Sequence, residues 1–190
     1  MGRASDLPDG ADALAEQALA VLAAAKRDDK LIATAESCTG GLLASLLTDL
    51  RGYGRVFDRA FVTYTDQAKC DMLGISEADL ARHGAVSAEI ARQMAHGALN
   101  GSQADVALAI TGFAGPGATN DEPGLVYLAV KDRKGHQAVR ECHFGDVGRE
   151  RTRQLAAHAG LEMLADALDC ALPSAAAPAP GQSRPRQVRA

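Results

Sequence analysis

One stretch of this chain, Asp105–Thr111, is almost continuously apolar and is followed at once by a glycine-rich loop, Gly112–Gly117. A strand without alternating apolar and polar residues is buried on both of its faces, as central strands of layered α/β domains are. This strand constrains the fold more than any other feature, because helices must cover both sides of the sheet that contains it.

The rest of the chain supplies helices and further strands in alternation. Apolar spacing predicts helices and strands by their different periods, and Ser76 opens one additional short helix through a capping box. Helices are expected over 11–26, 42–50, 66–73, 87–99 and 149–168, and strands over 31–35, 56–65, 105–111 and a hairpin of 124–131 with 137–144. The order predicts an α/β fold with one layered domain, a mixed β-sheet covered by helices.

Domain boundaries follow from composition. Residues 1–9 are polar and are expected to be frayed, and residues 10–171 form the folded domain. From 172 to 190 the chain is rich in Ala, Pro and Arg, with too little apolar surface to order itself, and we expect a disordered tail.

Bulk properties disfavour several classes of protein. The formal net charge of -4 argues against a nucleic-acid partner. No apolar run reaches the roughly 18 residues of a membrane span, and no signal-peptide pattern opens the chain, so a cytoplasmic location without membrane contact is expected. Neither the histidines nor the cysteines have metal-ligand spacing. The four cysteines are expected to be free thiols: Cys38, Cys70, Cys142 and Cys170.

The first candidate site, Thr34–Gly41, follows a predicted strand and opens a predicted helix. Ligands in α/β sheets bind at such junctions. Ser37 is a candidate nucleophile, and unpaired N–H groups of 39–41 could hold an oxyanion. Two alternatives stay open. Ser37 or Thr39 could serve only as the helix N-cap, or Cys38 could be the nucleophile, because a helix N-terminus lowers the pKa of a thiol.

A second strand-to-helix junction, Thr63–Lys69, supplies a candidate base. Desolvation among apolar neighbours lowers the pKa of a lysine amine, which would fit Lys69 to accept the proton of Ser37. No histidine is close to either junction in sequence. Tyr64 could donate a hydrogen bond in the site or pack in the sheet. The alternative for Lys69 is a solvated surface lysine.

Two further segments could bind an anion. The N–H groups of the glycine loop Gly112–Gly117 can converge on one anion, although the loop lacks a P-loop pattern and could simply be a tight turn. At the start of the last helix, Arg149 and Arg153 share a face at i,i+4 and could hold a phosphate together, with Arg151 beside them. The alternative is a solvated basic face.

Together these segments resemble the C-terminal domain of the competence/damage-inducible protein CinA, which is also found alone as nicotinamide mononucleotide deamidase. The resemblance covers roughly residues 10–170 and keeps the family's motif order. The matching stretches are Thr34–Gly41 (TAESCTGG), Phe61–Lys69 (FVTYTDQAK), His83–Ser87 (HGAVS), Thr111–Gly117 (TGFAGPG) and Pro123–Tyr127 (PGLVY).

The resemblance implies hydrolysis of nicotinamide mononucleotide to nicotinate mononucleotide and ammonia, with no metal and no cofactor. It implies a small-molecule nucleotide substrate and self-association as a homodimer or larger homo-oligomer. The catalytic residues it implies are Ser37 as nucleophile, Lys69 as base, and Tyr64. The substrate-binding residues it implies are Glu36, Thr39, Gly40, Gly41, Thr111, Gly112, Gly115, Gly117 and Arg149.

The chain departs from the family pattern before the last helix. The family has an arginine directly after a Gly-Asp pair, whereas here Val147-Gly148 separates Gly145-Asp146 from Arg149. The fused N-terminal domain of longer relatives is not in this sequence, so the stand-alone form is expected. Two other functions stay open: a non-catalytic nucleotide-binding module of the same fold, and an interaction protein that uses the Arg/Pro tail.

Overall fold

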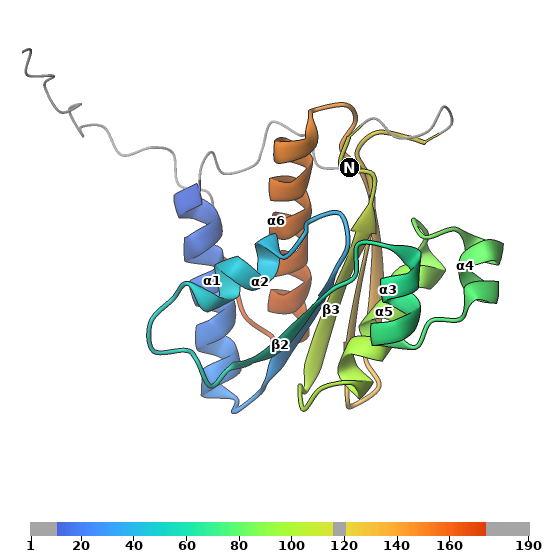
Figure 1. Cartoon of the computed structure of the whole chain (residues 1–190). Coiled ribbons are helices and arrows are strands. Elements are labelled where there is room, and N and C mark those ends of the chain that lie inside the picture. Colours follow the sequence, from blue (N-terminus) through green and yellow to red (C-terminus); the bar gives the residue numbers. More distant parts are fainter. Residues whose placement is uncertain (1–10, 116–120, 174–190) are drawn as a thin grey trace, which may run out of the picture.

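The computed structural model describes residues 11–115 and 121–173. Its five strands form one sheet in the order β2-β1-β3-β4-β5 (Figure 1). The strands are β1 Ile32–Glu36, β2 Phe57–Val62, β3 Val106–Gly112, β4 Leu125–Asp132 and β5 Gln137–His143. The helices are α1 Ala11–Arg27, α2 Leu42–Thr48, α3 Asp66–Leu73, α4 Glu77–His83, α5 Ala88–Asn100 and α6 Arg149–Ala167.

The strand directions make the sheet mixed. β1 pairs in parallel with β2 and β3, whereas β4 is antiparallel to both β3 and β5. The predicted single α/β domain, with β4 and β5 as a hairpin, is therefore confirmed. Because β1, β2 and β3 are parallel, their carboxyl ends meet at one edge of the sheet, which is where such folds place their ligands.

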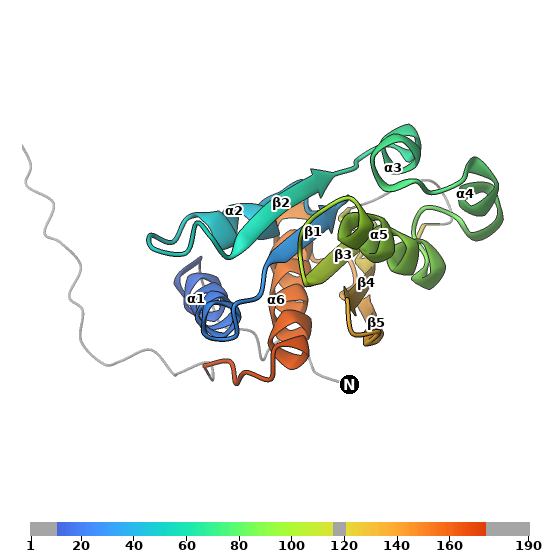
Figure 2. The same cartoon turned by 90° about the horizontal axis from the view of Figure 1, so that it is seen from below.

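Helices cover both faces of the sheet, as the apolar strand over 105–111 required. α1, α2 and α6 lie on one face and α3, α4 and α5 on the other, a separation that Figures 1 and 2 both show. Along β3, Leu108 and Ile110 face the first group, while Ala107 and Ala109 face α5. The small alanine side chains allow α5 to pack close to the sheet.

Most expected elements appear within one or two residues of their predicted limits. The strand over 56–65 is shorter than expected, because after Val62 the chain leaves the sheet toward α3. Thr63 N–H still donates to the Glu36 carbonyl at 2.8 Å, but the Thr65 hydroxyl already accepts from Ala68 N–H as the N-cap of α3. The segment that follows β2 therefore leaves the sheet and leads into the candidate site.

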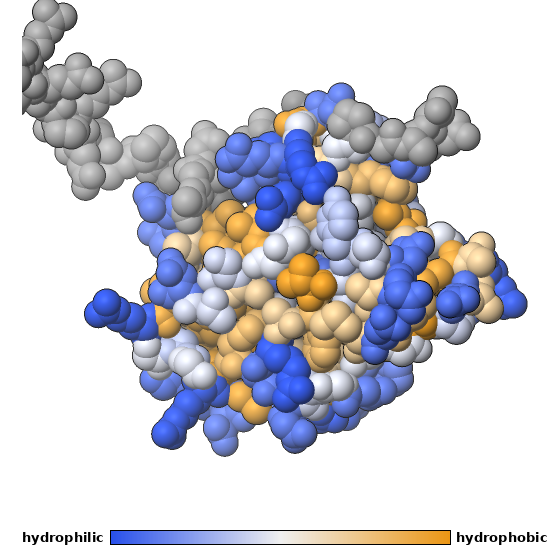
Figure 3. All heavy atoms as spheres, viewed as in Figure 1, coloured by the Kyte–Doolittle hydropathy of each residue, from blue (hydrophilic) through white to orange (hydrophobic). Residues whose placement is uncertain are grey.

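The surface of the α2 and β2 side mixes polar and apolar residues. Figure 3 shows hydrophobic residues near the centre of this face with hydrophilic ones around them. Val62, in the edge strand β2, has a relative exposure of 45%. None of the helices in the described ranges combines the length and apolar character that crossing a bilayer requires.

The expectations for the two ends of the chain fall almost wholly outside the structure. Residues 1–9 and 174–190 lie outside the described residues, as does Gly117 of the glycine loop. Leu172, which the sequence placed in the tail, is half-buried against the core cluster that contains α1 and α6.

Candidate active site

Ser37 is fixed by the sheet at the point where β1 ends. Its N–H donates to the carbonyl of Ile110 in β3 at 3.0 Å, and its own carbonyl accepts from Gly40 N–H at 3.1 Å. The residue is buried, with a relative exposure of 8%. The nucleophile candidate therefore sits on a backbone held by a neighbouring strand and by the turn that follows.

The start of α2 is capped by Glu36. Its fully buried carboxylate accepts from Leu43 N–H at 3.1 Å and from Ala44 N–H at 2.8 Å. Gly41, with φ 88°, occupies the N-cap position without a side-chain cap. The expectation that Ser37 or Thr39 caps this helix is wrong, because a carboxylate from the preceding strand does so.

The expected oxyanion site at 39–41 is also partly occupied by the protein itself. Gly40 N–H donates to Ser37, and Leu42 N–H donates to the Thr39 carbonyl at 3.2 Å. Because Glu36 takes the next two N–H groups, the positive end of α2 is directed at a protein carboxylate.

Lys69 projects from α3 to Ser37. Its Nζ lies 3.2 Å from Ser37 Oγ and donates to the Thr63 carbonyl at 3.1 Å. With an exposure of 1%, the residue is not the solvated surface lysine that the sequence left possible. Burial lowers the pKa of the Lys69 amine, while the carboxylate of Asp66, 3.9 Å from Nζ, acts in the opposite direction. A buried amine beside a hydroxyl is suited to accept its proton.

The pair opens into a cavity of about 300 Å³ at the carboxyl edge of the sheet. Of the predicted site residues, the structure brings seven to its lining: Ser37, Tyr64, Lys69, Thr111, Gly112, Gly115 and Arg149. Four others lie outside this lining: Glu36, Thr39, Gly40 and Gly41.

The structure adds wall residues to which sequence reasoning gave no role. Ala85 and Val86 come from the HGAVS stretch, and the Ala85 carbonyl accepts from the Thr111 hydroxyl at 2.8 Å. Asp66 also lines the cavity, as do Phe113 and Ala114 of the glycine loop. Only the motif match marked Ala85 and Val86, because apolar side chains and backbone carbonyls leave no chemical signature in a sequence.

The two arginines of the expected phosphate clamp have separate partners. Arg149 lines the cavity and donates from Nη2 to the Tyr64 hydroxyl at 3.3 Å. Arg153 instead donates from Nε and Nη2 to the Thr39 carbonyl, at 2.9 and 2.6 Å. The structure therefore brings Arg149 but not Arg153 to the cavity, and phosphate binding by Arg149 stays a prediction. Tyr64 is 62% exposed and lies at the rim of the cavity.

Cys38 lies next to Ser37 and also lines the cavity. Burial raises the pKa of its thiol to about 12. The thiolate is the nucleophilic form of cysteine, so this environment opposes Cys38 as the nucleophile and favours the neighbouring hydroxyl.

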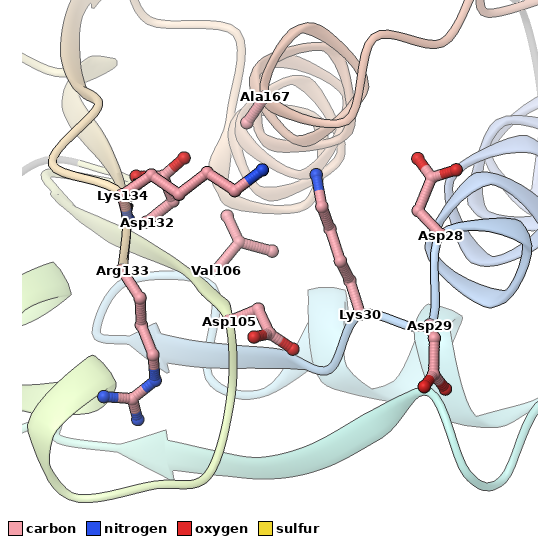
Figure 4. Close-up of a pocket in the computed structure, with 9 residues that line it drawn as sticks. All are labelled: Asp28, Asp29, Lys30, Asp105, Val106, Asp132, Arg133, Lys134 and Ala167. Atoms are coloured by element: carbon pink, nitrogen blue, oxygen red, sulfur yellow. Dashed lines mark hydrogen bonds between the residues drawn. The ribbon is translucent and has the colours of Figure 1, made fainter.

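A second hollow, of about 210 Å³, lies at the opposite edge of the sheet (Figure 4). Three of the charged side chains that line it form hydrogen bonds with backbone groups. Asp105 accepts from Leu31 N–H, Asp132 accepts from the N–H groups of Lys134 and His136, and Arg133 donates to three backbone carbonyls. Among the described residues that line it, none carries a hydroxyl or a thiol. The Ser37 cavity is thus the better candidate active site.

Comparisons with known proteins identify the family of this chain. The CinA C-terminal domain family model matches residues 13–168. The chain is 43% identical over 136 residues to the nicotinamide-nucleotide amidohydrolase PncC of Escherichia coli, covering 70% of this chain and 81% of that protein. It is 50% identical over 135 residues to a CinA-like protein of Syntrophobacter fumaroxidans, covering 70% of this chain but 31% of the relative. The chain thus spans about a third of such longer relatives.

Solved structures show the same fold. The competence/damage inducible protein CihA of Agrobacterium tumefaciens superimposes with a TM-score of 0.80 at 45% identity, covering 86% of this chain and 98% of that one. For a protein from Klebsiella pneumoniae the TM-score is 0.78 at 32% identity, with 82% and 97% covered. From the family match and these identities together, the chain belongs to the CinA C-terminal domain family.

Proposed function

We propose that this protein hydrolyses the carboxamide of nicotinamide mononucleotide, with Ser37 as nucleophile and Lys69 as general base. The observation that carries the proposal is the separation of 3.2 Å between Lys69 Nζ and Ser37 Oγ, two residues that line the cavity. The similarity to an amidohydrolase of nicotinamide nucleotides indicates the substrate class.

The reaction proceeds in two stages. The neutral Lys69 amine accepts the Ser37 proton as Oγ attacks the carboxamide carbon. The C–N bond then breaks, and the departing nitrogen takes the proton from Lys69 and leaves as ammonia. Water, activated by the same amine, cleaves the acyl-enzyme and releases nicotinate mononucleotide. Covalent catalysis divides one difficult amide hydrolysis into two easier steps.

The protein prepares Lys69 for this role in two ways. Burial favours the neutral amine over the charged form. The Thr63 carbonyl accepts one N–H of Lys69, which leaves the nitrogen lone pair for the Ser37 proton. In the resting state of this mechanism the hydroxyl is therefore the donor and the amine the acceptor.

Arg149 and Tyr64 are proposed to bind the phosphate and ribose at the mouth of the cavity. Their hydrogen bond places a guanidinium and a phenol side by side on one rim. A guanidinium matches a phosphate in charge and geometry. Thr111, Gly112 and Gly115 line the cavity further along β3 and its loop and would contact the rest of the substrate.

Ammonia release from purified protein tests the proposal. Nicotinamide mononucleotide, nicotinamide riboside and nicotinamide are each incubated with wild type and with Ser37→Ala, and the acid products are quantified by mass spectrometry. We expect wild type to hydrolyse the mononucleotide and Ser37→Ala to leave it intact. Binding of the mononucleotide without any turnover would indicate a non-catalytic nucleotide-binding module, and full activity of Ser37→Ala would exclude this nucleophile.

We further propose that the protein works in the cytoplasm and self-associates through β2. This strand is at the edge of the sheet, and Val62 exposes apolar surface there. Light scattering on wild type and Val62→Lys measures the effect. A lower mass for the variant supports this interface, and an unchanged mass contradicts it.

A further inference from the structure

Arg153 lies outside the cavity but contacts the turn that carries the nucleophile. From the second turn of α6, its Nε and Nη2 both donate to the carbonyl of Thr39, two residues after Ser37. The guanidinium is half-buried and joins elements that are far apart in sequence. A rigid planar fork of this kind holds an acceptor in a defined direction more strictly than a single donor can.

The turn needs such a restraint because its own backbone is permissive. Gly40 and Gly41 follow one another with φ of 59° and 88°, a region that glycine enters without steric cost. Within the turn only Gly40 N–H to Ser37 and Leu42 N–H to Thr39 close backbone hydrogen bonds, both between described residues. Arg153 Nη2 also lies 3.6 Å from the position that a Cβ of Gly40 would take.

We infer that Arg153 is a positioning residue, which holds the Thr39 carbonyl so that Ser37 Oγ stays within reach of Lys69 Nζ. The inference rests on the proposed function and deepens it. Arg153 does not line the cavity, whereas Arg149, one turn earlier on the same helix, does. The first turns of α6 therefore divide two tasks, substrate contact by Arg149 and alignment of the nucleophile by Arg153.

Kinetics of Arg153→Gln separate alignment from binding. A displacement of the nucleophile by about 1 Å can cost on the order of 10²-fold in rate, so we expect kcat to fall by that order. KM should stay within about twofold, because no substrate contact is lost. The loss should be equal for the mononucleotide and any slower riboside substrate, since phosphate binding is not involved.

Matched variants give controls for this measurement. Arg153→Lys keeps one donor but not the fork, and should retain more activity than Arg153→Gln. Guanidinium ion added to Arg153→Ala should restore part of the lost kcat. Arg92→Gln removes an arginine that pairs with Glu89 on α5, outside the cavity lining, and should leave kcat unchanged. The midpoint of the pH profile should not move in Arg153→Gln, because the pKa of Lys69 is set by its burial and by the nearby Asp66, Cys38 and Cys70.

Hydrogen–deuterium exchange gives a readout that does not depend on turnover. In Arg153→Gln, the amides of residues 37–43 should exchange faster, while those of β3 and α5 keep their wild-type rates. Wild-type kcat in Arg153→Gln, a change confined to KM, or unaltered exchange over 37–43 would overturn the inference. If wild type releases no ammonia from any compound, the proposed function fails, and exchange alone decides whether Arg153 restrains the turn.

Discussion

Lys69 Nζ and Ser37 Oγ lie 3.2 Å apart although the two residues are separated by 32 positions in sequence. Parallel pairing of β1 and β2 brings their carboxyl ends together, with Glu36 opposite Val62 in the register. The nucleophile directly follows β1, and the base lies in the first turn of α3, the helix that follows β2. The chemistry of the site is thus a consequence of strand pairing.

Replacing the base should abolish most activity without unfolding the protein. Lys69→Met keeps the length and apolar character of the buried stem but removes the proton acceptor. General-base catalysis contributes about 10² to 10⁴-fold, so kcat/KM should fall by at least about 10²-fold. Lys131→Met, on β4 where Nζ donates to the Gln137 side chain, is the matched control. An unchanged rate in Lys69→Met would exclude Lys69 as the base.

The pH profile should depend on Asp66. The pKa of Lys69 is lowered by burial and raised by the Asp66 carboxylate. Removing that charge in Asp66→Asn lowers the pKa of Lys69 further, so the free base persists to lower pH. The acidic limb of kcat/KM, which reports groups of the free enzyme, should therefore shift to lower pH. A shift to higher pH would contradict Lys69 as the titrating group.

Arg149 should control discrimination by phosphate. Arg149→Gln removes a charge-assisted contact, worth roughly 1.5–3 kcal/mol, and should raise KM for nicotinamide mononucleotide by about tenfold or more. Hydrolysis of the riboside, which has no phosphate, should change little. Steady-state kinetics with both compounds measure this. Equal losses of kcat/KM for the two compounds would show that Arg149 does not act through the phosphate.

Stability in acid should depend on Glu162 of α6. Hydrogen bonding to His158, and then to Arg140 of β5, lowers the pKa of Glu162 to about 2. Because this value is below the ordinary 4.5, the stabilisation is complete above about pH 4.5 and is lost as pH falls through about 2. The carboxylate is 40% exposed, so solvent screening limits the effect to about 1 kcal/mol.

Urea denaturation of Glu162→Gln measures this effect. The variant should be less stable than wild type at pH 7, and the difference should shrink below about pH 4.5 and vanish near pH 2. Glu16→Gln, an exposed position on α1, is the control. A difference that is constant from pH 7 to pH 2 would show that the carboxylate charge does not stabilise the fold.

The elements and their order were predictable because their signals are local. Helical spacing, the capping serine at Ser76 and the apolar run of β3 each depend on nearby residues, and each is found in the structure. The hairpin of β4 and β5 was predicted for the same reason. Motif resemblance located Ser37 and Lys69 but did not show that they touch.

The polar contacts between distant elements were not predictable. Glu36 was expected to bind substrate, but it caps α2 from the strand before it. The i,i+4 spacing left open whether Arg153 shares a phosphate with Arg149 or lies on a solvated face, but it donates to the Thr39 carbonyl. That spacing places both on one side of a helix but does not say which neighbouring element each will meet.

The sequence by itself determined the layers, the strand-to-helix junctions and the residue types available for chemistry, because periodicity and turn composition are properties of short segments. Only the tertiary structure decided which of these groups meet. The registers of β1, β2 and β3 place Ser37 against Lys69, and the packing of α6 on the sheet directs Arg149 to the cavity and Arg153 to the turn. Burial in the folded chain also makes Lys69 a weaker base than a free lysine and Cys38 a weaker acid than a free cysteine.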